Sequence, residues 1–291
     1  MKLATVLKDN KQVVVQIDDA RNTCQVLTLN GQAVDDMNWL IDNFSHVRNQ
    51  LANGETASLD DVTLQAPIPR PRRNIMCVGK NYFAHAHEFA SSGFDSSTTS
   101  AADAVPKKPI IFTKMPETVV PTGTPIGHPD KTLGKLDYEA ELGVIIGKAG
   151  MGIRQQDAMD HVFGYVIIND LTERGLQGEH KQWFLGKSFE TSCPMGPWIA
   201  TADELDAGNL DLKCWVNDEL RQDANTRDLI FNIPTLIETI SRGHRLLPGD
   251  IIATGTPVGV GIGFNPPKFL QAGDRVDITI TGLGKLSNTI A

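Results

Sequence analysis

The first seventy residues alternate hydrophobic and polar positions in short runs, which is the pattern of half-buried strands. Two turn dipeptides, Asp9-Asn10 and Asn30-Gly31, separate these runs. Hydrophobic residues then recur at three- and four-residue intervals from Met37 to Leu51, which predicts a helix ending near Asn53-Gly54. The predicted strands are Lys2–Leu7, Val13–Ile17 and Gln25–Leu29.

A connector rich in proline and arginine follows and marks a predicted domain boundary. Pro67, Pro69 and Pro71 alternate there with polar and basic residues, which indicates a stiff linker. We therefore predict a small N-terminal α+β domain at residues 1–70 and a larger domain at residues 71–291. The small domain shows no catalytic pattern, so we expect its role to be structural.

The larger domain is organised around the run Leu136–Ile146, which reads as one β-strand. Alternate residues of a strand face the same side, so Asp137, Glu139 and Glu141 would share one face. Neighbouring carboxylates at the edge of an apolar run lose hydration and repel one another unless a cation or strong donors compensate them. The alternative is a solvated strand face, which is the commoner origin of a Glu-x-Glu pattern.

A second apolar strand supplies a further carboxylate. The run Tyr165–Ile168 leads, after one asparagine, into Asp170. If the two strands are neighbours, Asp170 can converge with Glu139 and Glu141 on one hard cation. Carboxylate oxygens without nearby Cys or His suit Mg²⁺, Mn²⁺ or Ca²⁺ better than Zn²⁺. The sequence leaves open whether Asp137 is a fourth ligand or a solvated neighbour.

Upstream of both strands, His85 and Glu88 are three residues apart and would lie together on one helical turn. A carboxylate beside an imidazole fixes its tautomer and raises its basicity, as a general base requires. The same spacing also arises by chance. The small, polar run Ser91–Ala102 follows, and it fits either a mobile lid or an ordinary surface insertion.

Three further places carry candidate substrate contacts. Arg174 and Gln177 follow the second strand at a spacing that lets both reach one region, although a surface helix explains them equally well. Lys187 stands among apolar residues, where it could pair with a substrate carboxylate or oxyanion. Gly255 and Thr256 lie in a glycine-rich strand exit, where backbone N–H groups can approach a carboxylate closely.

Two local signals predict ordinary scaffold elements in the last third of the chain. Asn217-Asp218 between two strand-like runs is a hairpin turn signal. Asn232 with Pro234 marks the start of a helix, and Gly243 is expected to mark its end.

Composition and charge exclude several classes of function. The 291 residues carry a net charge of −8 without a long basic run, which argues against nucleic acid as a partner. The chain shows neither an apolar stretch of about 20 residues nor a signal peptide, so we expect a cytoplasmic protein with no membrane partner. The four cysteines are scattered, with no pair at the spacing of a zinc or redox motif.

Together these segments resemble the fumarylacetoacetate hydrolase family over residues 72 to 285, and they occur in the order that the family shows. Each segment alone is a weak signal, so the resemblance depends on the whole set. The matching stretches are Val78-Gly79-Lys80-Asn81-Tyr82 with His85 and Glu88, Phe112-Thr113-Lys114, Tyr138-Glu139-Ala140-Glu141-Leu142, Asn169-Asp170-Leu171-Thr172, Gly186-Lys187-Ser188-Phe189 and Thr254-Gly255-Thr256-Pro257-Val258-Gly259-Val260-Gly261.

This resemblance implies a β-rich mixed sandwich or β-roll of the α+β class, usually as a homodimer. It implies Mg²⁺ or Mn²⁺ as the cofactor, and a catalytic dyad on a lid that orders when substrate binds. The residues that it assigns are Glu139, Glu141 and Asp170 as metal ligands, His85, Glu88 and Lys187 as catalytic residues, and Arg174, Gln177, Gly255 and Thr256 as substrate contacts.

The family's substrates typically carry a 2-keto acid end. We expect hydrolysis of a C–C bond in an acylpyruvate such as maleylpyruvate or fumarylpyruvate, which releases pyruvate and a carboxylic acid. The complete His85–Glu88 pair favours this reaction, because it suits water activation. Oxaloacetate decarboxylation, or hydration or isomerisation of a 2-keto acid, are alternatives on the same scaffold. The alternative from a different functional class is a non-catalytic binding protein that has kept the fold.

Overall fold

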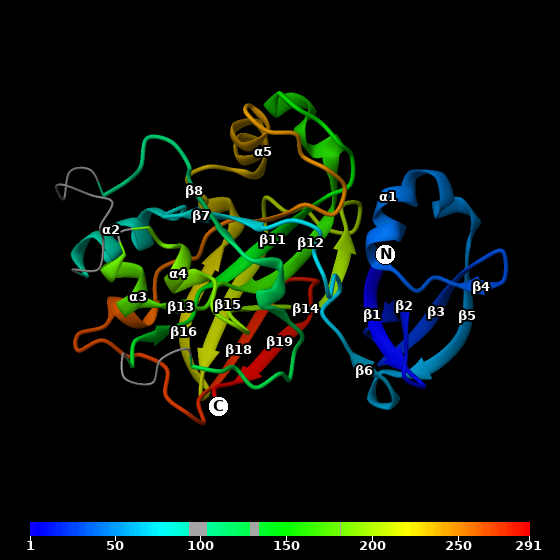
Figure 1. Ribbon diagram of the computed structural model, residues 1–291, viewed down its shortest axis with the longest axis horizontal. Coiled ribbons are helices and arrows are strands. Elements are labelled where there is room, and N and C mark those ends of the chain that lie inside the picture. Colours follow the sequence, from blue (N-terminus) through cyan, green and yellow to red (C-terminus); the bar gives the residue numbers. More distant parts are fainter. Residues whose placement is uncertain (93–103, 129–133, 181) are drawn as a thin grey trace.

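The computed structural model describes residues 1–92, 104–128, 134–180 and 182–291. Within these residues the chain forms many short strands and five α-helices (Figure 1). The prediction of a β-rich α+β protein is therefore confirmed. None of the helices in the described ranges is long and apolar enough to cross a membrane.

Residues 1–64 form an antiparallel sheet with helix α1 (Met37–Val47) packed against it. The three predicted strands are present, and the residues of both predicted turns have positive φ. The predicted end of the helix is wrong, because Arg48–Gln50 form a short 3-10 helix and the residues from Leu51 onward pair as a strand with β3. The strands are β1 (Lys2–Lys8), β2 (Lys11–Asp18), β3 (Thr23–Leu29), β4 (Gln32–Ala33), β5 (Leu51–Ser58) and β6 (Thr63–Leu64).

The rest of the chain alternates strands with short helices. Its helices are α2 (Phe83–Ser91), α3 (Arg174–Glu179), α4 (Phe184–Lys187) and α5 (Ile233–Ser241). Its strands are β7 (Ile75–Gly79), β8 (Ile110–Lys114), β9 (Val119–Val120), β10 (Leu136–Asp137), β11 (Ala140–Ile146), β12 (Val162–Asn169), β13 (Thr172–Glu173), β14 (Cys193–Thr201), β15 (Asp211–Val216), β16 (Glu219–Asn225), β17 (Ile251–Ala253), β18 (Arg275–Ile280) and β19 (Lys285–Thr289).

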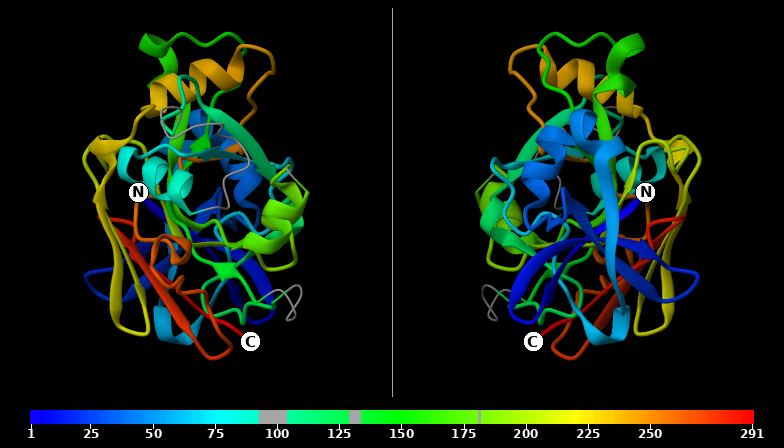
Figure 2. Two further views of the ribbon diagram at one scale, coloured as in Figure 1. Left: turned by 90° about the vertical axis from the view of Figure 1, so that its left-hand side faces the viewer. Right: turned by 90° about the vertical axis from the view of Figure 1, so that its right-hand side faces the viewer.

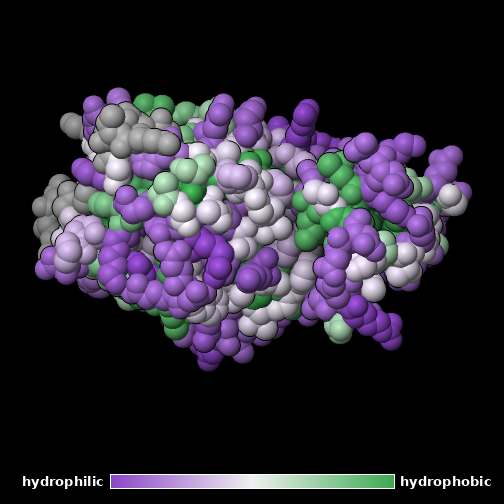
Figure 3. Space-filling model, turned by 90° about the horizontal axis from the view of Figure 1, so that it is seen from below, coloured by the Kyte–Doolittle hydropathy of each residue, from purple (hydrophilic) through white to green (hydrophobic). Residues whose placement is uncertain are grey.

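One continuous sheet joins the N-terminal module, residues 1–64, to the rest of the protein. Strand β1 pairs antiparallel with β14, so that Leu3 lies opposite Ile199. Across the described residues this sheet follows the order β4-β3-β2-β1-β14-β12-β11-β17-β7-β8. The module lies at one end of the molecule, and α2, α3 and α4 lie at the other (Figure 1). The face seen in Figure 3 is largely hydrophilic, with hydrophobic residues gathered beside the module. The domain boundary at residue 70 stays a prediction.

A second sheet, in the order β16-β15-β18-β19, packs against the large sheet (Figure 2). The core between them includes Leu142 and Ile167 from β11 and β12, and Leu212 and Ile278 from β15 and β18. The opposite face of β11 and β12 is also buried, within the cluster that includes α1. These two strands are thus covered on both sides, which makes them a rigid support for the residues at their ends.

The prediction of one unbroken strand from Leu136 to Ile146 is wrong, because the chain breaks at Tyr138-Glu139. Side-chain oxygens accept hydrogen bonds from the backbone N–H groups at this break. The Asp137 carboxylate accepts the Tyr138 N–H at 2.9 Å, and Asn169 Oδ1 accepts the Glu139 N–H at 3.1 Å. Asp137 therefore belongs to β10, which pairs with β13 in a separate two-stranded sheet.

Two scaffold predictions from the last third of the chain are confirmed. Asn217 and Asp218 have φ values of 49° and 70°, the left-handed values that a two-residue hairpin between β15 and β16 requires. Helix α5 begins directly after Asn232, whose side-chain oxygen accepts the Thr235 N–H at 3.0 Å. The helix ends at Ser241, close to the expected glycine.

Candidate active site

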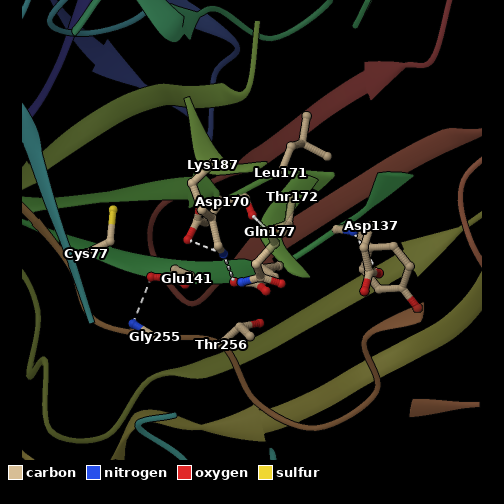
Figure 4. Close-up of polar contacts among 12 residues, drawn as sticks. Cys77, Asp137, Glu141, Asp170, Leu171, Thr172, Gln177, Lys187, Gly255 and Thr256 are labelled. Atoms are coloured by element: carbon tan, nitrogen blue, oxygen red, sulfur yellow. Dashed lines mark hydrogen bonds and ion pairs between the residues drawn. The ribbon is translucent and has the colours of Figure 1, made fainter. Parts of the chain in front are cut away.

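Three buried carboxylates meet where β11 and β12 run side by side. Ala140 lies opposite Asn169 in this antiparallel pair, which brings Glu139 and Glu141 next to Asp170. One carboxylate oxygen from each of the three residues lies within 4.8 Å of the others. At most 5% of the surface of any of them is exposed. The predicted convergence of two strands on one carboxylate cluster is therefore present (Figure 4).

Basic side chains compensate the charge of this cluster. The Lys187 Nζ lies 2.7 Å from Glu139 Oε2 and 2.7 Å from Asp170 Oδ2. The Lys114 Nζ lies 2.8 Å from the other oxygen of Asp170, and Lys114 is fully buried. Lys187, predicted as a catalytic residue, thus contacts two of the candidate metal ligands in this structure. Lys114 had no predicted role, although it ends an apolar strand and belongs to one of the stretches that resemble the family.

The carboxylates differ in how strongly they hold a proton. Burial alone would raise the pKa of Glu139, but the charges of Lys187 and Arg174 outweigh it and lower that pKa to about 2. Burial, with the charges of Asp170 and Glu139, raises the pKa of Glu141 well above its ordinary value. A dry group of oxygen donors in which one carboxylate is undercompensated fits a hard divalent cation such as Mg²⁺ or Mn²⁺.

Helix α2 carries the predicted dyad to the same place. The His85 Nδ1 lies 2.9 Å from Glu88 Oε2, and the second Glu88 oxygen accepts the Gly259 N–H at 3.0 Å. His85 is 5% exposed, whereas His87, two residues further along the helix, is exposed to solvent. Because Glu88 occupies Nδ1, the Nε2 atom is the one left for proton transfer. Of the predicted lid loop, residues 93–102 lie outside the described residues.

A small cavity connects the dyad with the cluster. Its volume is about 20 Å³, which is room for about one water molecule. Phe89 of α2 and Trp183 close it on one side, and their rings meet edge to face with centroids 5.9 Å apart. Six of the predicted site residues line it: His85, Glu139, Arg174, Gln177, Lys187 and Thr256.

Arg174 and Gln177 are both buried and face the cavity. The Arg174 Nη2 lies 2.7 Å from Glu139 Oε1, and its Nη1 donates to Gln177 Oε1 at 3.0 Å. Asp137 binds the same guanidinium, with its Oδ2 2.9 Å from Arg174 Nε. Figure 4 shows Asp137 apart from Glu141 and Asp170, so Asp137 is a partner of Arg174 and lies outside the carboxylate cluster.

The two predicted substrate contacts in the glycine-rich segment after β17 have different partners in the structure. The Gly255 N–H donates to Glu141 Oε2 at 2.7 Å, so in this structure it supports a candidate metal ligand. Gly255 has a φ of +101°, and a β-carbon there would lie 2.8 Å from the Asn81 side chain. Thr256 lines the cavity, and its hydroxyl accepts a hydrogen bond from Gln222 Nε2 at 2.8 Å.

Two amide residues hold the site together and were missed in the sequence. Asn81 donates to the Thr254 carbonyl at 2.8 Å and so ties the start of α2 to the end of β17. Gln222 of β16 accepts the Ala140 N–H at 3.1 Å while it binds Thr256. Asn81 belongs to a motif that was noticed, but Gln222 comes from a strand with no sequence signal for the site.

The chain is similar to known proteins over most of its length. The fumarylacetoacetate hydrolase C-terminal family matches residues 74–291. Oxaloacetate tautomerase YisK of Bacillus subtilis strain 168 is 51% identical over 234 residues, which are 80% of this chain and 74% of that protein.

Solved structures resemble the chain over its whole length. A fumarylacetoacetate hydrolase from psychrophilic Exiguobacterium antarcticum has a TM-score of 0.84 at 36% identity, over 100% of this chain and 99% of its own. Maleylpyruvate hydrolase from Sphingobium sp. SYK-6, solved with manganese(II) and pyruvate, has a TM-score of 0.77 at 32% identity, over 100% and 99%. The family match, the sequence identities and the shared fold together show that the chain belongs to the fumarylacetoacetate hydrolase family.

Proposed function

We propose that this protein is a metal-dependent enzyme that interconverts the keto and enol forms of oxaloacetate. The observation that carries this proposal is the shared cavity, which is lined by His85 of the dyad and by Glu139 of the carboxylate cluster. One base and one cation site suffice for a proton shift beside a keto group. The 51% identity to an oxaloacetate tautomerase supports the choice of substrate.

The cofactor would be Mg²⁺ or Mn²⁺, held by Glu139, Glu141 and Asp170. Once bound, it would polarise the 2-keto group and acidify the neighbouring C–H bonds. The buried oxygen donors fit either metal, and the manganese(II) found with the maleylpyruvate hydrolase relative supports Mn²⁺.

The protein's own residues would bind the acid and move the proton. In this scheme His85 Nε2 takes a proton from C3, the C–H electron pair becomes the C2–C3 double bond, and the C2–O π pair moves onto the 2-oxygen. That oxygen then takes the proton from the imidazolium to give the enol, which leaves His85 neutral again. Glu88 holds the imidazole in the required orientation through Nδ1. Arg174 supplies positive charge for a substrate carboxylate, beside Gln177. The present cavity is too small for oxaloacetate, so the proposal requires the cavity to widen when the substrate binds.

Hydrolysis of an acylpyruvate is the second candidate function. The structural likeness to a maleylpyruvate hydrolase solved with pyruvate favours it, and so does the complete dyad. In this reaction His85 takes a proton from water, the hydroxide adds to the distal carbonyl, and the C–C bond breaks to give pyruvate and a carboxylic acid. Lys187 would balance the oxyanion charge.

A side-by-side assay tests these proposals. Ketonisation of enol-oxaloacetate is followed by its ultraviolet absorbance, and pyruvate release is followed from maleylpyruvate, fumarylpyruvate, acetylpyruvate and oxaloacetate, each with Mn²⁺ and with EDTA. Fast, EDTA-sensitive ketonisation without pyruvate supports the tautomerase. Faster pyruvate release from an acylpyruvate would make the protein a hydrolase, and release from oxaloacetate a decarboxylase. Stabilisation by Mn²⁺ without turnover of any substrate would indicate a binding protein.

The homodimer remains a proposal from the family resemblance, and the cytoplasmic location remains one from the composition and the cysteine pattern. Light scattering coupled to size-exclusion chromatography measures the molar mass and so tests the homodimer. The mass of a single chain would contradict it.

A further inference from the structure

Asp137 connects the cavity wall to the segment on which helix α2 rests. Its carboxylate is fully buried. One oxygen accepts the Gly261 N–H at 2.6 Å, and the other accepts the Ile262 N–H at 3.2 Å together with Arg174 Nε at 2.9 Å. The carboxylate thus accepts backbone N–H groups of the Gly261–Ile262 segment through both oxygens, and the Arg174 guanidinium through one of them.

The guanidinium side of this contact reaches the cavity. Arg174 binds Glu139 and Gln177, and its guanidinium lies 5.7 Å from the centre of the Phe89 ring on α2. Asp137 is one of two carboxylates that hold this arginine, and Glu139 is the other. Without Asp137, the arginine would depend on a residue that also belongs to the carboxylate cluster.

The backbone side of the contact is the segment Gly259–Gly263, which we call the docking loop. Its Gly259 N–H donates to Glu88 Oε1 at 3.0 Å. Its Val260 and Ile262 side chains pack in one cluster with Phe89 and Trp183. Gly263 approaches Glu88 so closely that a β-carbon there would overlap the carboxylate. Helix α2 therefore rests on a loop whose other side Asp137 holds.

We propose that Asp137 is a positioning residue that couples the orientation of Arg174 to the docking of α2. The same carboxylate holds Arg174, which faces the proposed substrate, and the docking loop, on which the helix with the dyad packs. Asp137 therefore places the arginine and the dyad at the cavity together. The substrate role of Arg174 rests on the proposed function, whereas the coupling of the arginine to the loop does not. Asp137 contacts neither the cavity nor the carboxylate cluster, and it acts through its partners.

The variant Asp137→Asn tests the coupling in the full-length, metal-free protein. Asparagine keeps the shape, but its amide nitrogen is a donor that accepts no hydrogen bond. The variant therefore loses either the bonds from the Tyr138 and Gly261 N–H groups or those from the Ile262 N–H and Arg174. Hydrogen exchange of the α2 and docking-loop amides should become at least about tenfold faster, since a hydrogen bond to a charged group is lost. Exchange in β11 and β12 should stay slow, which shows that the fold is intact.

Asp250→Asn is the matched control. Asp250 is also buried, and it also binds an arginine and a backbone N–H, namely Arg73 at 2.8 Å and Leu247 at 2.8 Å. It does not line the cavity. Its variant should leave α2 exchange as in the unmodified protein. Equal exchange of α2 in Asp137→Asn and the unmodified protein would overturn the proposal.

Kinetics give a second, independent readout. Asp137→Asn should raise KM for oxaloacetate about tenfold through the lost arginine contact, with Mn²⁺ affinity by calorimetry unchanged. In an Arg174→Lys background the same change should have little further effect, because the residue through which it acts is already altered. Additive effects of the two changes would overturn the coupling. If the unmodified protein turns over no substrate, the proposed function fails, and hydrogen exchange still decides the coupling.

Discussion

Replacing Lys187 with methionine should make the stability of this protein depend on metal. Lys187 is 2% exposed and lies 2.7 Å from Glu139 and from Asp170, so the change removes the shared cation of two buried carboxylates. Removing one partner of a buried ion pair costs about 3–5 kcal/mol. For a chain of this size each kcal/mol shifts Tm by about 2–4 °C, so a loss of about 6–20 °C is expected in EDTA.

A divalent cation should restore most of this loss, because it supplies positive charge to the same carboxylates. Binding at a hundred times Kd adds about 2.7 kcal/mol, so the rise in Tm from EDTA to Mn²⁺ should be larger in Lys187→Met than in the unmodified protein. Differential scanning calorimetry measures both values. The control is Lys213→Met, whose ion pair with Asp223 is 3.3 Å long and exposed, and which should cost at most about 1 kcal/mol.

Two results would refute this reasoning. One is an equal loss of Tm in EDTA and in Mn²⁺, which would show that Lys187 acts through packing. The other is a loss no larger than that of Lys213→Met, which would show that the carboxylates do not need this cation.

Three further changes test other parts of the site and scaffold. His85→Ala should keep the fold and Mn²⁺ binding and lower kcat by about 10²–10⁴-fold, and near-full turnover would remove His85 from the mechanism. Gly263→Ala, where a β-carbon would overlap the Glu88 carboxylate, should lower kcat without changing Mn²⁺ affinity, and an unchanged kcat would show that α2 can shift without loss. Hydrogen bonds from Thr201 and an arginine lower the pKa of Asp203 from 3.8 to about 2, so its stabilising effect is full above about pH 4 and lost as pH falls through about 2. The Tm advantage over Asp203→Asn should therefore vanish near pH 2, and an advantage that persists there would contradict the assignment.

The sequence predicted the carboxylate cluster because one local rule and one assumed strand pairing suffice for it. A period of two places Glu139 and Glu141 on one side of the chain, and the antiparallel neighbour brings Asp170 beside them. The dyad was predictable for the same reason, since His85 and Glu88 lie on one helical turn. The dyad is thus encoded within a few residues, whereas the cluster also needs β11 and β12 to pair.

The parts that the sequence did not predict depend on contacts between distant segments. Gln222 reaches the site from another sheet, so its role appears only when that sheet is packed against β11. Asp137 does not share a strand face with Glu139 and Glu141, because side chains accept the backbone N–H groups of the next two residues and the strand is interrupted there. The first helix ends earlier than predicted because the residues from Leu51 onward pair as a strand with β3. This tertiary pairing outweighs the helical spacing of their hydrophobic side chains.

The pairing of β1 with β14 has a consequence for how the chain folds during synthesis. The N-terminal module leaves the ribosome before β14 does, and β1 can pair with β2 and β6 as soon as these have emerged. The backbone groups of Lys2 and Leu3 that face β14 must wait until residues 199 and 200 have emerged. Until then the nascent chain carries an open strand edge, which is a site for wrong pairing with other chains. We therefore expect an early need for a chaperone or a slow final docking step, both set by the length of chain between the two strands.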